Sequence, residues 1–290
     1  MSLQSFLFRF GASRSDKKRD AAIPIPQGVT QCRDLSYGSY GDENLLDVYY
    51  PEGTAASLPT IVSIHGGGYT YGNKEIYLRY CMDLARRGFA VVNFNYRLAP
   101  KWKFPAPLED TNAVLSWMVK NAERFHLDPQ RVILIGDSAG AQLTSQYAAM
   151  LANPEYASHF IMDLPPITIR AVGLFCGMYD LKARASEKRS GLHGDYLGKA
   201  LPLDDPRFNV LASIGENYPP AFIATSYEDF LHDMAQPMAD FLTAKGIPNV
   251  CKCYGKAGDK KVGHVFHVNI ALPEATQCND DATAFWRQYV

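Results

Sequence analysis

The sequence RVILIGDSAG, residues 131–140, decides the fold that this chain predicts. Its four apolar residues, 132–135, are typical of a strand buried on both faces, and the run 141–151 that follows is typical of a helix. Between them Ser138 stands two residues after Gly136 and two before Gly140. Glycines at these places remove side chains that would collide in a sharp turn, so the hydroxyl would project at the start of a helix. The pattern alone also fits an ordinary turn, but the flanking strand and helix favour a reactive serine.

The rest of the chain alternates strand and helix patterns. Strands are predicted at residues 32–37, 45–50, 60–64, 89–96, 169–176, 221–226 and 250–254. Helices are predicted at residues 76–87, 108–125, 234–245 and 281–289. This order is typical of an α/β fold with a mostly parallel central sheet and helices on both faces.

Two segments stand outside this alternation. Residues 1–28 precede the first strand, and an apolar helix face within them is predicted from the spacing of Leu3, Phe6, Leu7 and Phe10. Such a face would be buried at the substrate entrance, against another subunit in a homodimer, or on a membrane surface. We expect the first, with residues 1–28 as a cap on a catalytic domain of residues 29–290. Residues 181–218 predict an excursion that adds to this small helical cap.

Composition excludes several classes of protein. With 29 basic and 30 acidic side chains the formal charge is −1, so nothing indicates nucleic-acid binding. The first apolar run is interrupted by Arg9 and does not fit a secretory signal, and no stretch is long enough for stable insertion into a membrane. The six cysteines are scattered and expected to be reduced. We therefore expect a cytoplasmic protein.

A serine nucleophile needs a base, and the base needs a third group that orients it. Asp229 follows the predicted strand 221–226, and His264 follows the predicted strand 250–254. Both therefore come after Ser138 in the order serine, acid, histidine, which suits an α/β-hydrolase fold. Alternatives nearby are Glu228 and Asp233 for the acid and His267 for the base.

An acyl-transfer reaction also needs hydrogen-bond donors for an oxyanion. Gly66, Gly67 and Gly68 follow the predicted strand 60–64 directly after His65. Backbone N–H groups without side chains can turn towards a substrate oxygen, beside the N–H of Ala139.

Three motifs together carry a family resemblance: HGGG at residues 65–68, YRLAP at 96–100 with FPA at 104–106, and GDSAG at 136–140. From about Tyr37 to its end the chain resembles the hormone-sensitive-lipase-like esterases of the α/β-hydrolase superfamily. The resemblance implies a carboxylesterase with an N-terminal cap and an oxyanion hole made by Gly67, Gly68 and Ala139. It also implies that His65 shapes the loop and is not the base, and it includes the motif residues Gly66, Gly136, Asp137 and Gly140.

The chain departs from the family pattern at three places. Residues 229–231 read DFL where the family usually has DPL, and residues 264–266 read HVF where it usually has HGF. Neither change replaces a reacting group. Residues 101–103, KWK, stand where the family tends to carry an acidic residue or a histidine, at the expected substrate rim.

The predicted function is that of a serine carboxylesterase, which hydrolyses short to medium acyl esters through an acyl-enzyme on Ser138 without a cofactor. A sugar-ester deacetylase and an amide or formamide hydrolase are alternatives of the same class. A ligand-binding protein on the same scaffold is the alternative of another class, but His264 and His267 favour an enzyme, because receptors related to this family have lost the histidine. A zinc site is disfavoured, because the C-x-C spacing is tight for the candidate ligands Cys251, Cys253, His264 and His267.

Overall fold

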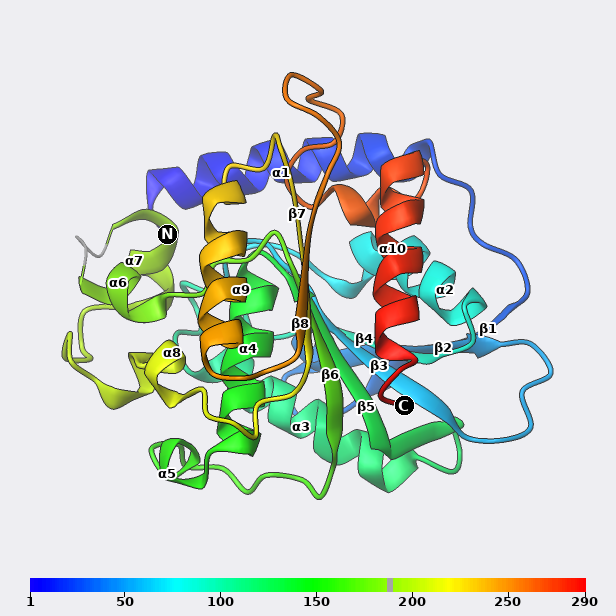
Figure 1. Ribbon diagram of the computed structural model, residues 1–290, viewed down its shortest axis with the longest axis horizontal. Helices are drawn as coiled ribbons and strands as arrows, with labels where there is room; N and C mark the ends of the chain where they lie inside the picture. Colours follow the sequence, from blue (N-terminus) through cyan, green and yellow to red (C-terminus); the bar gives the residue numbers. More distant parts are fainter. Residues whose placement is uncertain (187–189) are drawn as a thin grey trace.

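One twisted sheet runs through the centre of the protein (Figure 1). The computed structural model of the chain describes residues 1–186 and 190–290. In this part of the chain the sheet has eight strands in the order β1-β2-β4-β3-β5-β6-β7-β8. β2 pairs antiparallel with β1 and β4, and the other neighbours are parallel, so the predicted mostly parallel sheet is confirmed. The strands are β1 (Val29–Ser36), β2 (Leu45–Pro51), β3 (Leu58–Ile64), β4 (Ala90–Phe94), β5 (Leu127–Asp137), β6 (Ile169–Phe175), β7 (Ala221–Ser226) and β8 (Asn249–Tyr254).

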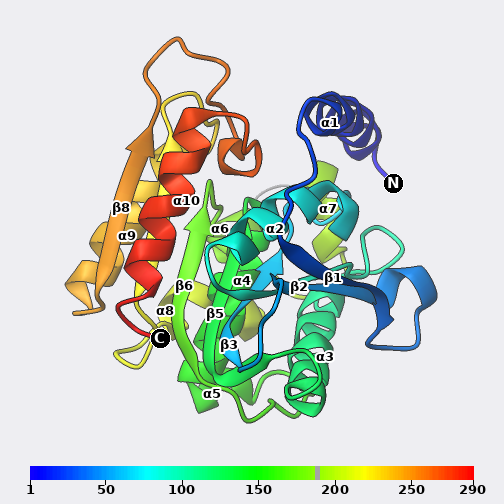
Figure 2. The same ribbon diagram turned by 90° about the vertical axis from the view of Figure 1, so that its right-hand side faces the viewer.

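Helices cover both faces of the sheet, as the alternation of elements predicts (Figure 2). One face carries α3 (Ala106–Asn121), α4 (Ala139–Ala152) and α9 (Ala235–Ala244), and the other carries α2 (Leu78–Arg86) and α10 (Pro273–Trp286). The apolar run of β5 explains this arrangement. Val132 and Leu134 pack in the core on one side, and Ile133 and Ile135 pack in the core on the other. A strand covered on both faces therefore reads as a continuous apolar run.

The last helix is longer and begins earlier than its sequence predicts. The predicted range 281–289 is wrong, because α10 begins at Pro273, a residue that suits the first turn of a helix. Its buried face includes Ala275, Cys278 and Ala282, which are small and give a weak apolar signal among polar neighbours. The predicted helix 76–87 also differs, because its first residues belong to a 3-10 turn, η2 (Lys74–Tyr77), that precedes α2.

Two segments lie over the carboxyl ends of the parallel strands (Figures 1 and 2). The first is α1 (Leu3–Ala21). The second is the first part of the predicted excursion, which folds into α6 (Leu181–Ser186) and α7 (Gly191–Leu197). The excursion continues through the 3-10 turn η3 (Pro206–Phe208) to α8 (Val210–Ser213), which packs beside α4. Residues 187–189 of that excursion lie outside the described residues.

Polar contacts hold α1 at both ends. At its start the backbone N–H of Ser2 donates to Asp195 Oδ2 of α7 at 2.7 Å. Near its end Arg19 donates to the carbonyl of Ile76 at 2.7 Å. Among the described residues, no helix combines the length and the apolar character that crossing a bilayer would require.

Candidate active site

Ser138 lies at the apex of the turn between β5 and α4. Its backbone is strained, with φ 52° and ψ −115°, and its N–H donates to the carbonyl of Phe175 at 2.9 Å. A side chain at Gly136 would come within 2.3 Å of the Gly140 carbonyl oxygen, and one at Gly140 would come within 2.1 Å of the Ile64 carbonyl oxygen. Both glycines are therefore required by close backbone packing. The turn leaves Ser138 on the wall of a cavity of about 730 Å³.

Asp137 is buried beneath this turn. Its Oδ2 accepts a hydrogen bond from the hydroxyl of Tyr77 at 2.8 Å, and the same hydroxyl accepts one from the N–H of Gly66 at 3.1 Å. A Cβ at Gly66 would lie 2.2 Å from that carboxylate oxygen. Burial raises the pKa of Asp137 to about 7, although the Tyr77 hydrogen bond acts against this shift. Tyr77 thus links the serine turn to the glycine loop, and no local sequence pattern indicates this.

Asp229 and His264 are brought together by the ends of β7 and β8. His264 Nδ1 lies 2.6 Å from Asp229 Oδ1. The carboxylate also accepts hydrogen bonds from the N–H of Leu231 and the hydroxyl of Thr225, both at 2.9 Å. Burial acts to raise the pKa of Asp229, but the hydrogen bond from His264, the charge of that ring and the other two donors together lower it. The acid therefore stays ionised and can orient the imidazole.

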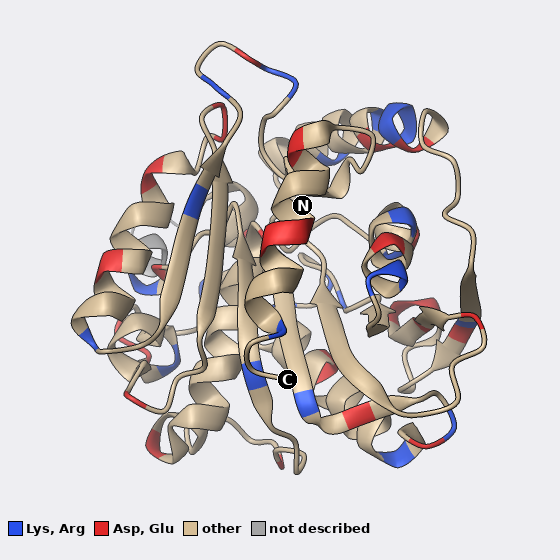
Figure 3. Ribbon diagram, turned by 45° about the vertical axis from the view of Figure 1, so that its right-hand side comes forward, with Lys and Arg blue, Asp and Glu red and all other residues tan. Residues whose placement is uncertain are grey.

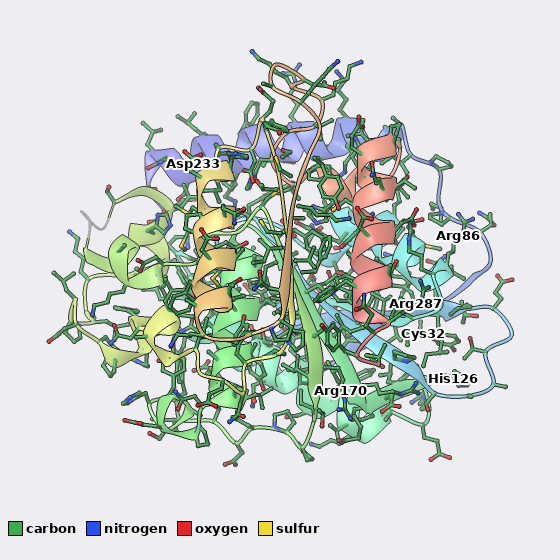
Figure 4. The ribbon with its side chains drawn as sticks, viewed as in Figure 1. Cys32, Arg86, His126, Arg170, Asp233 and Arg287 are labelled. Atoms are coloured by element: carbon green, nitrogen blue, oxygen red, sulfur yellow. The ribbon has the colours of Figure 1, made fainter. Side chains whose placement is uncertain are left out.

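The two other candidate acids lie elsewhere. Glu228 accepts a hydrogen bond from the N–H of Gly258 at 2.7 Å. Asp233 is exposed near the start of α9, at the end of the molecule where α1 lies (Figure 4). Neither of these carboxylates contacts His264 in the described part of the chain.

An aromatic ring and a thiol lie beside His264. The ring of Phe230 lies 4.1 Å from the imidazole, between ring centroids, and is 73% exposed. The Cys176 thiol is also near, because one side-chain atom each of Cys176, Asp229 and His264 lies within 4.8 Å of the other two. In the described residues Cys251 and Cys253 do not join His264 in such a cluster.

The two remaining histidines of the motifs are buried. His65 stacks on Tyr96 with ring centroids 4.1 Å apart, and burial lowers its pKa to about 4. His267 stacks on Phe175 at 4.3 Å, and burial, followed by the charge of His264, lowers its pKa to about 3. Neither ring lines the cavity that Ser138 and His264 share within the described residues. Their positions suit packing and do not suit proton transfer at Ser138.

The glycine loop follows β3 and has a backbone that other residues would rarely adopt. Gly67 has φ +112° and Gly68 has φ +56°. The carbonyl of Gly67 accepts hydrogen bonds from the N–H groups of Thr70 and Tyr71 at 3.1 and 3.0 Å, which closes the loop into a tight turn. Gly67, Gly68 and Ala139 all line the same cavity as Ser138.

The cavity is roofed by α1, but not by the face that its sequence predicts. Residues of α1 that line it are Gln4, Phe8, Ala12, Ser15, Asp16 and Arg19. The predicted apolar face is instead exposed, at 73% for Leu3, 54% for Phe6, 59% for Leu7 and 67% for Phe10. The prediction that this face is buried at the entrance is therefore wrong, because the opposite face of the helix lies there.

The excursion completes the roof, and the KWK segment does not reach it. Leu192 and His193 of α7 line the cavity. None of residues 101–103 is among its lining residues in the described part of the chain, so the expected place of this segment at the substrate rim is wrong. Lys101 and Trp102 both contact Glu43, at 3.1 and 2.9 Å.

A protein family described by its alpha/beta hydrolase fold matches residues 61–268, well over half of the chain. This chain belongs to the α/β-hydrolase fold family. The match begins in β3, includes the glycine loop and Ser138, and ends after His264. The predicted fold and the resemblance to esterases of this superfamily are thereby confirmed.

Curated relatives of this α/β-hydrolase carry the names of esterases. It is 31% identical over 198 residues to the ethyl acetate hydrolase of Pseudomonas putida, and the alignment covers 64% of this chain and 61% of that protein. It is 28% identical over 221 residues to the carboxylesterase NlhH of Mycobacterium tuberculosis, with 69% of this chain and 65% of that protein. The matched part thus spans less than two thirds of the length of these relatives.

A solved structure is similar over nearly all of this α/β-hydrolase. Inhibited esterase B from Lactobacillus rhamnosis superposes with a TM-score of 0.85 at 25% identity, covering 96% of this chain and 93% of that one. A bacterial heroin esterase superposes with a TM-score of 0.75 at 22% identity, which shows a common fold. The fold is therefore shared with these solved structures.

Proposed function

We propose that this protein is a serine carboxylesterase that hydrolyses esters of short to medium acyl chains. The observation that supports it best is the 2.6 Å contact of Asp229 with His264, in a cavity that also exposes Ser138 at a strained turn. The names of the curated relatives, an ethyl acetate hydrolase and a carboxylesterase, support the same reaction class.

In the proposed mechanism Ser138 attacks the carbonyl carbon of the ester. His264 takes the hydroxyl proton through Nε2, because Nδ1 is engaged with Asp229, and passes it to the leaving alcohol. Water, activated by the same ring, then releases the acid from the acyl-enzyme. The N–H groups of Gly67, Gly68 and Ala139 hold the oxyanion in both steps.

The alternative of a ligand-binding protein on this scaffold is less well supported. A binding site has no need for an ionised, buried carboxylate that accepts hydrogen bonds from His264, Thr225 and Leu231. Such a carboxylate orients the imidazole and stabilises its protonated form, which is the role that catalysis requires. The cavity of about 730 Å³ accommodates a small ester beneath α1.

The direct test is Ser138→Ala, with Ser15→Ala as the matched control. Both serines line the cavity, but Ser15 belongs to α1. We expect Ser138→Ala to lower kcat for p-nitrophenyl acetate by about 10⁴- to 10⁶-fold and to abolish labelling by a fluorophosphonate, while Ser15→Ala keeps both. A folded Ser138→Ala protein with a tenth of the wild-type kcat would refute the assignment.

A further inference from the structure

Within residues 1–186 and 190–290, no part of the protein covers the outward side of α1. Leu3, Phe6, Leu7 and Phe10 are each more than half exposed, as given above. A helix advances by about 100° per residue, so Arg14, Lys17 and Lys18 continue the same side towards its end. We call these seven residues the outer face of α1. Its first half is apolar, and its second half is basic and exposed.

The charges of the outer face are not neutralised. The two acids of the helix, Asp16 and Asp20, both pair with Arg19, at 2.9 and 2.8 Å. In the described residues Lys17 and Lys18 form no hydrogen bond or ion pair through their side chains. The outer face is therefore free to attract an anionic surface.

A second basic segment lies at the same end of the molecule as α1 but apart from it (Figure 2). The loop of residues 255–263 extends beyond the level of the helix (Figure 1) and carries basic residues (Figure 3). Its exposed lysines are Lys256, Lys260 and Lys261. The last two also line the cavity, so this loop lies at the rim of the site.

We propose that the outer face of α1, together with the loop 255–263, docks the protein reversibly on the surface of an anionic lipid bilayer. An interfacial helix places large apolar side chains among the acyl chains and basic ones among anionic headgroups. The outer face offers both along one side. Docking would bring the rim of the cavity to the lipid surface, but it does not depend on the proposed activity.

A second copy of the chain fits this face less well. In an antiparallel pairing, the α1 helices of the two copies could overlap along their whole length. The basic half of each outer face would then lie against the apolar half of the other copy's outer face. A parallel pairing would bring Arg14, Lys17 and Lys18 of the two copies together, and like charges repel. A lipid surface meets neither difficulty, because it presents apolar chains and anionic groups at different depths.

The test is sedimentation with vesicles of phosphatidylcholine, with and without 30% phosphatidylserine. We expect the protein of residues 1–290 to bind the anionic vesicles, and to bind at least ten-fold more weakly to the neutral ones or in 1 M salt. Lys17→Gln/Lys18→Gln should weaken binding about 25-fold, at about five-fold for each charge. Leu7→Gln/Phe10→Gln should weaken it more than ten-fold.

Matched controls come from the opposite end of the molecule. Arg170 is exposed there, near the start of β6 (Figure 4). Ile161, between α4 and β6, is fully exposed, and Lys120 is exposed in the last turn of α3. Ile161→Gln and Lys120→Gln/Arg170→Gln should bind vesicles as the wild type does. Melting followed by circular dichroism checks that every variant is folded.

Three results would overturn the proposal. One is a wild-type protein that does not bind anionic vesicles. Another is equally tight binding by the outer-face variants and the controls. The third is a wild-type dimer in analytical ultracentrifugation that becomes monomeric in Leu7→Gln/Phe10→Gln without vesicle binding, which would assign the outer face to contact between two copies.

Discussion

Replacing Gly67 with alanine tests the oxyanion loop most sharply. An added Cβ at Gly67 would lie 2.0 Å from the carbonyl oxygen of Tyr71, a backbone atom, whereas real Cβ contacts are not shorter than 3.0 Å. The loop must therefore shift by about 1 Å or more, which lengthens a hydrogen bond of about 2.9 Å beyond its useful range. Losing one oxyanion donor typically costs about 10²- to 10³-fold in kcat, or about 2.7–4 kcal/mol.

Two other glycines provide controls for Gly67→Ala. At Gly68, φ is +56° and the clash at 2.1 Å is with the tip of the Leu192 side chain, which can rotate away. At Gly88, φ is +91°, and apart from its chain neighbours no heavy atom of the described residues lies within 4 Å of the added Cβ. We expect Gly68→Ala to lose less than about ten-fold in kcat. Gly88→Ala should lose about 1 kcal/mol or more of stability, because its backbone is also unfavourable for alanine, with no change in kcat.

The assay is steady-state hydrolysis of p-nitrophenyl acetate, with melting followed by circular dichroism. The oxyanion contact strengthens in the transition state, so Gly67→Ala should lower kcat and leave KM within a few-fold. If folded Gly67→Ala keeps more than a third of the wild-type kcat, or if only KM changes, the N–H groups of this loop do not hold the oxyanion.

The remaining predictions concern the histidines and the inner side of α1. His264→Ala should lower kcat about as much as Ser138→Ala does, while His267→Gln should change kcat less than ten-fold. The reverse ranking in the same ester assay would move the base to His267. Burial lowers the pKa of His267 to about 3, so acidification below 6.5 protonates the unfolded chain and not the folded one. Stability is therefore lost as the pH falls, and this group accounts for about 2 kcal/mol of the loss at pH 5. The free energy of unfolding in urea should fall less between pH 7 and pH 5 for His267→Gln than for the wild type. An equal fall would contradict the inference. Phe8→Ala should raise KM and alter acyl-chain preference, because Phe8 lines the cavity. Phe10→Ala should leave both unchanged, because Phe10 is exposed. Similar effects of the two variants on KM would show that the helix does not shape the site in this orientation.

Much of the fold is determined locally. The apolar run 132–135 reads as a strand because both of its faces are covered, and the glycines around Ser138 are required by backbone contacts that any such turn would make. The order of strands also determines that segments after β3, β5, β7 and β8 meet at one edge, because the carboxyl ends of parallel strands lie together. The sequence alone thus predicts that Ser138, Asp229 and His264 come from one end of the sheet.

Only the tertiary structure decides which neighbours complete the site. Tyr77 joins Asp137 to Gly66, and Thr225 supports Asp229, through contacts between side chains that no periodic pattern encodes. The choice of Asp229 over Glu228 likewise depends on how the loops after β7 and β8 turn.

The orientation of α1 shows most clearly where local pattern is insufficient. Its spacing of apolar residues correctly predicts a helix, but hydrophobicity favours burial of Leu3, Phe6, Leu7 and Phe10, and these lie exposed. The helix is instead oriented by Ser2 with Asp195 and by Arg19 with Ile76, contacts that join residues far apart in the chain. Hydrophobic periodicity measures how much apolar surface a helix has to bury, whereas long-range polar contacts decide which side of it meets the rest of the protein.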